Sequence, residues 1–129
     1  MKILFVCDHN VLRSQLASAL FNKLACKHYS VSAGIIASNA GKRPGDVDSN
    51  VPAIMSSLGL NTVGNKVKKL TRQMVNSADI IIVMADSEWP DYLKSSGKGR
   101  TWGITDEQPY SKTVEEIKER VDALIQELG

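Results

Sequence analysis

The distribution of apolar residues along the chain predicts four short strands. The first covers residues 2–7 and carries the run Ile3-Leu4-Phe5-Val6. Such an unbroken apolar run is typical of a strand buried on both faces of a parallel sheet, so we expect it to be the central strand. The other predicted strands cover residues 29–32, ending at Ala33-Gly34, residues 79–84 and residues 101–104.

Between the strands, apolar residues recur at the spacing of amphipathic helices. The first such pattern begins at Ser14, and the most regular one covers residues 114–128. Thr113 and Glu116 have the spacing of a capping box, which predicts that Thr113 caps this last helix. Further helices are expected at residues 51–58, stopped by Gly59, at residues 71–77 and at residues 87–94, and residues 37–48 are expected to form a loop.

Strands and helices therefore alternate along the whole sequence. This order predicts a doubly wound parallel sheet with right-handed crossovers, in which ligands bind beyond the carboxyl ends of the strands. The chain has 129 residues and contains no repeat, linker or low-complexity segment. We therefore expect one α/β domain over residues 1–129, large enough to bury a continuous core without disulfides.

Composition narrows the possible partners and the compartment. The formal net charge is only +2, so no broad positive field indicates a nucleic acid partner. No apolar stretch approaches the length of a membrane span, and the first apolar run is too short for a secretion signal. We expect a cytoplasmic protein that is a monomer or a weak dimer, in which Cys7 and Cys26 remain free thiols.

The segment between the first strand and the first helix has the composition of an oxyanion site. It reads Cys7-Asp8-His9-Asn10-Val11-Leu12-Arg13-Ser14. Successive amide N–H groups in such a loop, together with the positive end of the following helix, bind a tetrahedral anion without any cofactor. We therefore expect residues 8–14 to surround a phosphate-like group and to stabilise the thiolate of Cys7 as a nucleophile.

Three side chains of this loop have chemically distinct predicted roles. Asn10 is the residue that tolerates a positive φ, which a tightly curled loop requires. Arg13 offers a planar fork for two oxygens of a phosphoryl group. Ser14 is placed to donate a hydrogen bond to the Cys7 sulfur, which matters most when that sulfur is the leaving group.

These residues resemble a known enzyme family. The pattern Cys-x5-Arg-Ser with Asn10 in the loop, the strand end Ser32-Ala33-Gly34 and a late Asp resemble the low-molecular-weight protein tyrosine phosphatases and the related thioredoxin-coupled arsenate reductases. The resemblance covers nearly the whole chain. It implies a single-domain, three-layer, flavodoxin-like fold with a four-stranded parallel sheet in the order 2-1-3-4 and a phosphate-binding loop after the first strand.

The resemblance also implies a general acid and a supporting residue. Asp106 follows the fourth predicted strand, so a parallel sheet places it at the same edge as Cys7. The family has Asp-Pro at this point, whereas this chain reads Asp106-Glu107-Gln108-Pro109, and Glu107 is the alternative acid. Ser32, and less clearly Asn65, fall where residues brace the loop Asn.

Phosphomonoester hydrolysis through a phosphocysteine is the leading hypothesis, on a phosphorylated protein or a small phosphomonoester. The thioredoxin-coupled reductases require two further cysteines near the end of the third strand, and this chain has none there. Leu12 stands where many of the phosphatases have a second cysteine. Two alternatives remain open: an arsenate reductase that uses glutathione and glutaredoxin, and a non-hydrolytic phosphocysteine carrier or anion-binding module.

Overall fold

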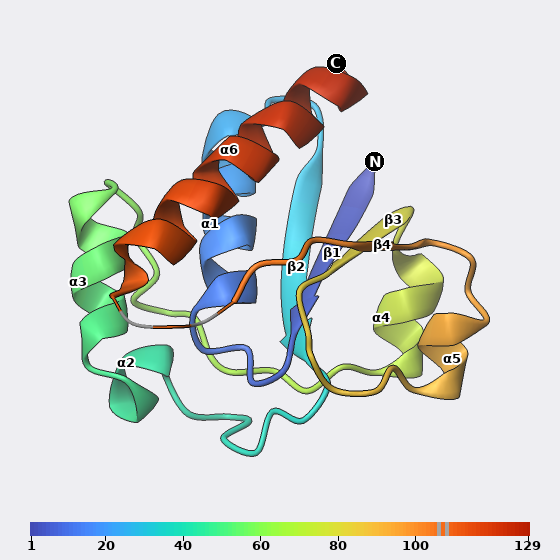
Figure 1. Ribbon diagram of the computed structural model, residues 1–129, viewed down its shortest axis with the longest axis horizontal. Coiled ribbons are helices and arrows are strands. Elements are labelled where there is room, and N and C mark those ends of the chain that lie inside the picture. The colour runs from blue at the N-terminus through green and yellow to red at the C-terminus, as the bar shows by residue number, and fades with distance from the viewer. Residues whose placement is uncertain (106, 108) are drawn as a thin grey trace.

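The computed structural model describes residues 1–105, 107 and 109–129 of the chain. Its centre is a four-stranded parallel sheet in the order β2-β1-β3-β4, as expected. The strands are β1 (Lys2–Cys7), β2 (Tyr29–Gly34), β3 (Ile80–Val83) and β4 (Gly99–Thr101). Figure 1 shows that both termini lie at one end of the molecule, while the loop after β1 lies at the other.

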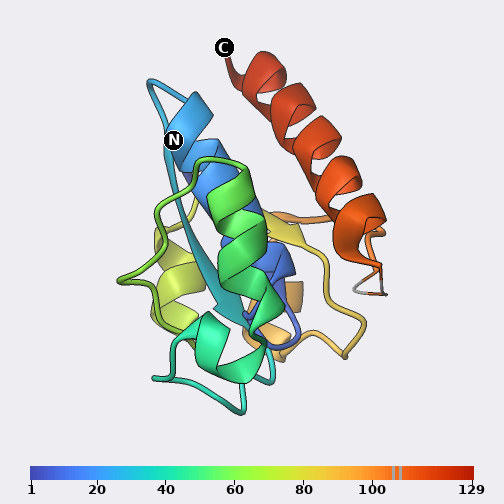
Figure 2. The ribbon, with the colours of Figure 1, turned by 90° about the vertical axis from the view of Figure 1, so that its left-hand side faces the viewer.

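Helices cover both faces of this sheet. One face carries α1 (Arg13–Leu24) and the long α6 (Tyr110–Leu128), and the other carries α4 (Arg72–Ser77) and α5 (Asp91–Lys94). The short α2 (Pro44–Val47) and α3 (Asn50–Ser57) lie outside α1, where Figure 2 shows α3 toward the viewer. This is the predicted three-layer α/β fold of a single domain. None of the helices in the described part of the chain is long and apolar enough to span a bilayer.

The first strand is apolar throughout because both of its faces are buried. Ile3 and Phe5 belong to the core beneath α1 and α6, whereas Leu4 and Val6 belong to the core beneath α4 and α5. Alternate side chains of a strand point to opposite faces, so a strand between two helical layers needs apolar residues at every position. The sheet thereby holds the end of β1, and with it Cys7, in a rigid frame.

The structure corrects the predicted boundaries of three elements. Residues 37–48 contain the helix α2, which has Pro44 at its first position, where its fixed φ favours helix initiation. The helix predicted over residues 87–94 begins only at Asp91, because Pro90 disfavours helical backbone before it. The fourth strand runs from Gly99 to Thr101 and not from 101 to 104, since its partner β3 ends at Val83.

The predicted cap of the last helix is also wrong. Helix α6 begins at Tyr110, directly after Pro109, so Thr113 lies within its first turn. The Thr113 hydroxyl instead donates a hydrogen bond to the carbonyl of Thr105 at 2.7 Å. Spacing alone could not reveal this, because the same spacing fits a helix that begins earlier, and here the N-cap position is occupied by Pro109. Thr113 therefore ties the segment after β4 to α6.

Candidate active site

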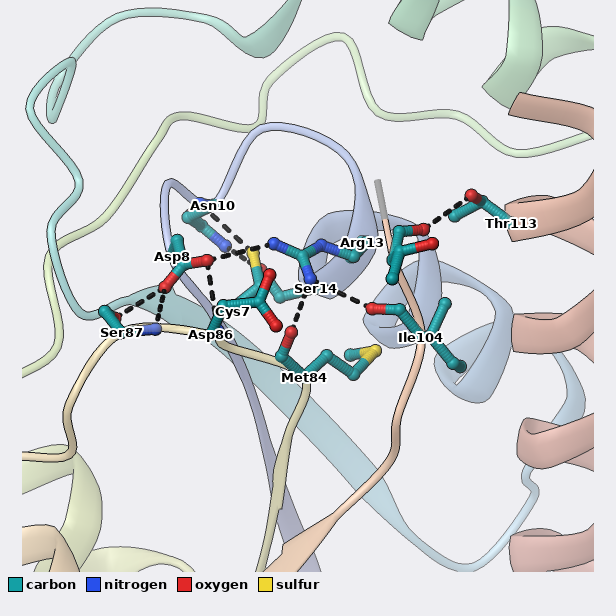
Figure 3. A network of polar contacts seen from close by, with 11 residues as sticks. Cys7, Asp8, Asn10, Arg13, Ser14, Met84, Asp86, Ser87, Ile104 and Thr113 are labelled. Atoms are coloured by element: carbon teal, nitrogen blue, oxygen red, sulfur yellow. Dashed lines mark hydrogen bonds and ion pairs between the residues drawn. The ribbon is translucent and has the colours of Figure 1, made fainter. Parts of the chain in front are cut away.

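The loop between β1 and α1 curls around the sulfur of Cys7. Cys7 is the last residue of β1 and Arg13 is the first residue of α1, so both ends of the loop are held by regular structure. Asn10 lies between them with a φ of 60°, in the left-handed region, as its identity predicts. Figure 3 shows that this turn brings Asn10, Arg13 and Ser14 around Cys7.

Two groups of the loop bond to the Cys7 sulfur. The amide of Asn10 donates to Sγ at 3.2 Å, and the Ser14 hydroxyl lies 2.9 Å from it. The Asn10 side-chain amide donates to Ser14 Oγ at 2.7 Å, so that oxygen already accepts one hydrogen bond. The hydroxyl proton of Ser14 is thereby left to point at the sulfur. Two hydrogen-bond contacts of this kind suit a sulfur that gains negative charge when it acts as a leaving group.

The side chain of Asn10 is itself fixed by four hydrogen bonds. Its Nδ2 donates to Ser14 and, at 3.0 Å, to the hydroxyl of Ser32. Its Oδ1 accepts from Gln15 Nε2 at 3.0 Å and from the Lys68 amide at 2.8 Å. These bonds use the full hydrogen-bonding capacity of the amide and hold the strained loop residue in place.

The residues that brace Asn10 include one that the sequence interpretation missed. Ser32 lies in the predicted bracing position, whereas Asn65 reaches Asn10 only through Gln15, whose Oε1 accepts from Asn65 at 3.3 Å. Gln15 is buried in the first turn of α1, although it is polar. The signal in the sequence was that Gln15 is a polar residue directly after Arg13-Ser14.

Arg13 is 4% exposed, and only some of its N–H donors have partners among the described residues. Nη1 donates to the carbonyls of Met84 and Ile104, and Nη2 donates to Asp8 Oδ2 at 3.3 Å. A guanidinium carries five N–H bonds. The Nε–H has no partner among the described residues, and Nη2 keeps its second N–H. In a guanidinium, Nε–H and one Nη–H form an edge that suits the bidentate binding of an oxyanion.

The other loop residues contribute less directly. Leu12 is buried in the core together with Cys7, whereas His9 is exposed. The Asp8 side chain, which was expected among the phosphate-binding groups, points to the segment after β3 and accepts hydrogen bonds from Asp86 and Ser87. A carboxylate can only accept hydrogen bonds and therefore cannot bind an anion. Asp8 can therefore donate to a bound anion only through its main-chain amide.

The predicted acid Asp106 lies outside the described residues. The segment that leads to it is fixed at two points, because the Ile104 carbonyl accepts from Arg13 at 3.0 Å and the Thr105 carbonyl accepts from Thr113. Glu107 is exposed and lines a small cavity at the start of α6. None of the described residues that line this cavity belongs to the Cys7 loop, so the geometry does not favour Glu107.

The second cysteine is remote from the first. Cys26 is exposed and follows the end of α1, whereas Cys7 precedes the start of that helix. A helix of this length separates its ends by about 18 Å, while a disulfide needs Cα atoms within about 7 Å of each other. The two thiols are free, as expected.

The same arrangement of chain is found in known proteins. The family model described as "Low molecular weight phosphotyrosine protein phosphatase" matches residues 2–129. A protein of Ralstonia solanacearum described as "Probable low molecular weight protein-tyrosine-phosphatase EpsP" is 31% identical over 86 residues, which cover 67% of this chain and 57% of that protein. The chain thus matches little more than half the length of this relative.

Solved structures share the whole fold. A thioredoxin-dependent arsenate reductase of Corynebacterium glutamicum is 29% identical with a TM-score of 0.79, over 99% of this chain and 63% of its own. A low molecular weight protein tyrosine phosphatase from T. tengcongensis is 26% identical with a TM-score of 0.74, over 98% and 99% of the two chains. Taken with the family match over residues 2–129, the chain belongs to the low molecular weight phosphotyrosine protein phosphatase family.

Proposed function

We propose that this protein hydrolyses phosphomonoesters through a phosphocysteine on Cys7, in the manner of a protein tyrosine phosphatase. The observation that carries the proposal is the remaining edge of the Arg13 guanidinium. Its Nε–H, unpaired among the described residues, and one Nη2–H lie buried beside a sulfur that Asn10 and Ser14 stabilise. A nucleophile next to a bidentate anion-binding group is what transfer of a phosphoryl group requires.

In the first step, the Cys7 thiolate attacks phosphorus and the ester P–O bond breaks. Asp106, as a carboxylic acid, gives its proton to the departing oxygen, so that an alcohol or phenol leaves. Arg13 and the amides of residues 8–14 stabilise the charge on the three equatorial oxygens. In the second step, Asp106 takes a proton from water, the resulting hydroxide attacks phosphorus and the P–S bond breaks. Inorganic phosphate and the thiolate are the products.

Three features support these roles. Family membership supports a phosphorylated substrate. The Ile104 carbonyl at Arg13 supports Asp106 as the acid, because the chain passes the anion site two residues before it. The Ser14 hydroxyl supports the second step, since it stabilises the sulfur as a leaving group. A reducing compartment such as the cytoplasm suits this chemistry, because it keeps Cys7 a thiol.

Arsenate reduction is the second candidate, and the similarity to an arsenate reductase of Corynebacterium glutamicum favours testing it. The separation of Cys7 from Cys26 decides how it would proceed. With Cys26 beyond the far end of α1 and Leu12 in the core, the arsenate–Cys7 adduct must be reduced by an external thiol, such as glutathione with glutaredoxin.

The test compares p-nitrophenyl phosphate hydrolysis with thiol-dependent arsenate reduction in four proteins: wild type, Cys7→Ser, Asp106→Asn and the matched control Glu107→Gln. We expect wild-type hydrolysis, complete loss in Cys7→Ser, and a loss of about 100-fold to 10,000-fold in Asp106→Asn. Glu107→Gln should stay within about three-fold of wild type, because Glu107 is exposed.

Three outcomes would contradict the proposal or one of its assignments. Undiminished hydrolysis in Cys7→Ser would reject Cys7 as the nucleophile. Arsenate reduction by the wild type with glutathione and glutaredoxin, but no hydrolysis, would establish the second candidate in its place. A larger loss in Glu107→Gln than in Asp106→Asn would transfer the acid role to Glu107.

A further inference from the structure

The carboxylate of Asp8 is a buried negative charge directly beside the nucleophile. Asp8 follows Cys7 in sequence and is 8% exposed. Its Oδ1 accepts hydrogen bonds from the Ser87 amide at 3.0 Å and from the Ser87 hydroxyl at 2.5 Å. Its Oδ2 accepts from the Asp86 amide at 3.2 Å and from Arg13 Nη2 at 3.3 Å. Figure 3 shows this carboxylate between Arg13 and Ser87.

The hydrogen-bond partners favour the ionised form of this carboxylate. Three of its four partners are N–H groups, which can only donate, so a proton on Oδ2 would face two other donors. Burial acts to raise the pKa of Asp8, but the bonds from Ser87 and Asp86 and the charge of Arg13 outweigh it and hold the pKa below its usual value. The anion site therefore has a fixed negative charge of its own.

This charge alters the electrostatic balance at the anion site. Arg13 supplies one positive charge, and the start of α1 adds roughly half of another. The negative charges are those of the Cys7 thiolate in the proposed mechanism, the Asp8 carboxylate and the bound anion. Because Asp8 bonds to the same guanidinium that must bind the anion, it offsets part of the attraction for any free anion, and it does so most for the more highly charged species.

We propose that Asp8 is a specificity-determining residue that acts through Arg13: its carboxylate weakens the binding of free inorganic phosphate. The inference rests on the proposed function, in which inorganic phosphate is the product. A phosphatase whose product binds weakly is inhibited less by it. Nη1 of Arg13 also donates to the carbonyls of Met84 and Ile104, so two bonds that do not involve Asp8 hold the guanidinium in place.

The experiment measures the binding of inorganic phosphate by calorimetry to wild type, Asp8→Asn, Asp8→Ser and the control Asp91→Asn. Asp91 lies in the first turn of α5 and is exposed, so its substitution removes the same charge far from the loop. We expect phosphate to bind about ten-fold more tightly to both Asp8 variants, as the loss of one unit charge a few ångströms away implies. Asp91→Asn should bind phosphate as the wild type does.

A purely structural role for Asp8 predicts that its substitution does not tighten phosphate binding. If the carboxylate only holds the loop and Arg13 in place, both Asp8 variants will bind phosphate more weakly than the wild type or equally well, and either result overturns the proposal. The absence of detectable binding in all four proteins overturns it as well. Thermal unfolding checks that each variant is folded, and Asp8→Ser serves where Asp8→Asn places an amide N–H against the donor groups of Ser87 or Arg13.

Calorimetry keeps this test separate from the test of hydrolysis. Phosphate binding needs no turnover, so a wild type that fails to hydrolyse p-nitrophenyl phosphate would reject the proposed function without changing the calorimetric comparison. Where hydrolysis is observed, the inhibition constant for inorganic phosphate provides a second readout. It should fall about ten-fold in the Asp8 variants, and an unchanged or raised constant would contradict the role of Asp8.

Discussion

At the scale of single residues, the loop between β1 and α1, residues 8–12, depends on Asn10 for two separate reasons. Its backbone has a φ of 60°, which costs an alanine about 1–2 kcal/mol but costs a glycine nothing. Its side chain joins Ser14, Ser32, Gln15 and the Lys68 amide. The backbone sets the shape of the loop, and the Asn10 amide orients the Ser14 hydroxyl that bonds to the Cys7 sulfur.

Substitution of Asn10 by glycine and by alanine separates the two contributions. Both variants lose the side-chain bonds, so we expect kcat to fall about 10-fold to 100-fold in each, because Ser14 is no longer oriented toward the sulfur. Only Asn10→Ala adds backbone strain, so its free energy of unfolding should be about 1 kcal/mol below that of Asn10→Gly. Urea unfolding and p-nitrophenyl phosphate kinetics measure the two effects. Equal stability of the two variants would argue against a strained φ.

At the scale of elements, β2 supports the loop by a close backbone contact at Gly34. A Cβ at this position would lie 2.8 Å from the Asp8 carbonyl oxygen and 2.9 Å from the amide nitrogen of Asn10. Real Cβ atoms do not approach backbone atoms so closely, and backbone cannot move aside as a flexible side chain can. The register that places Gly34 beside Cys7 therefore brings the second strand directly under the anion loop.

The variant Gly34→Ala is expected to displace the loop from β2. Activity should fall by at least about 100-fold, because a shift of about 1 Å in a catalytic loop has this effect, and stability should fall by about 1–3 kcal/mol from overpacking. Gly64→Ala is the matched control, since a Cβ there meets nothing within 4 Å. Retention of full activity in Gly34→Ala would show that the loop does not need this contact.

At the scale of the whole molecule, a hydrogen bond joins two segments that lie far apart in the sequence. The Tyr110 hydroxyl at the start of α6 donates to Asp48 Oδ2, between α2 and α3, at 2.7 Å. This bond, together with the Asn50 amide, outweighs the effect of burial and lowers the pKa of Asp48 from its usual 3.8. Segments separated by 62 residues in sequence are thus linked through one carboxylate.

This linkage predicts a contribution of Asp48 to stability that depends on pH. A carboxyl group whose pKa is lower in the folded state stabilises the fold above its unfolded pKa, which is about 3.9, and loses that contribution as pH falls through the folded value. Between about pH 5 and pH 2, wild type should therefore lose about 0.5–1 kcal/mol more stability than Asp48→Asn. Urea unfolding at a series of pH values measures the difference.

The control for this comparison is Asp46→Asn. Asp46 is exposed in the first turn of α2, two residues before Asp48. Its variant should lose stability with acid as the wild type does. If Asp48→Asn also followed the wild-type curve, the bond to Tyr110 would contribute nothing to the fold in solution.

Local patterns were enough to predict the frame of the active site. The apolar run at residues 3–6 indicated a strand buried on both faces, and the helical spacing after Ser14 indicated the helix that follows it. A left-handed loop residue was predicted at Asn10 because few other residue types accept that conformation. Each of these predictions depends only on residues that are neighbours in the sequence, so it needs no knowledge of tertiary contacts. The boundaries of α5 and β4 failed because Pro90 and the length of β3 decide them.

What the sequence by itself determined is the alternation of strands and helices and the place of the loop between β1 and α1, with Cys7, Asn10 and Arg13 in or beside it. Only the tertiary structure decided which groups surround Arg13, since the carbonyls of Met84 and Ile104 come from the segments that follow β3 and β4, 71 and 91 residues away. Every residue has a backbone carbonyl, so the sequence does not indicate which carbonyls will accept from Arg13. The sequence also does not indicate whether the Asp8 carboxylate faces a bound anion or points away from it. Contacts of this kind are set by the folded sheet, which brings the carboxyl ends of its parallel strands to one edge.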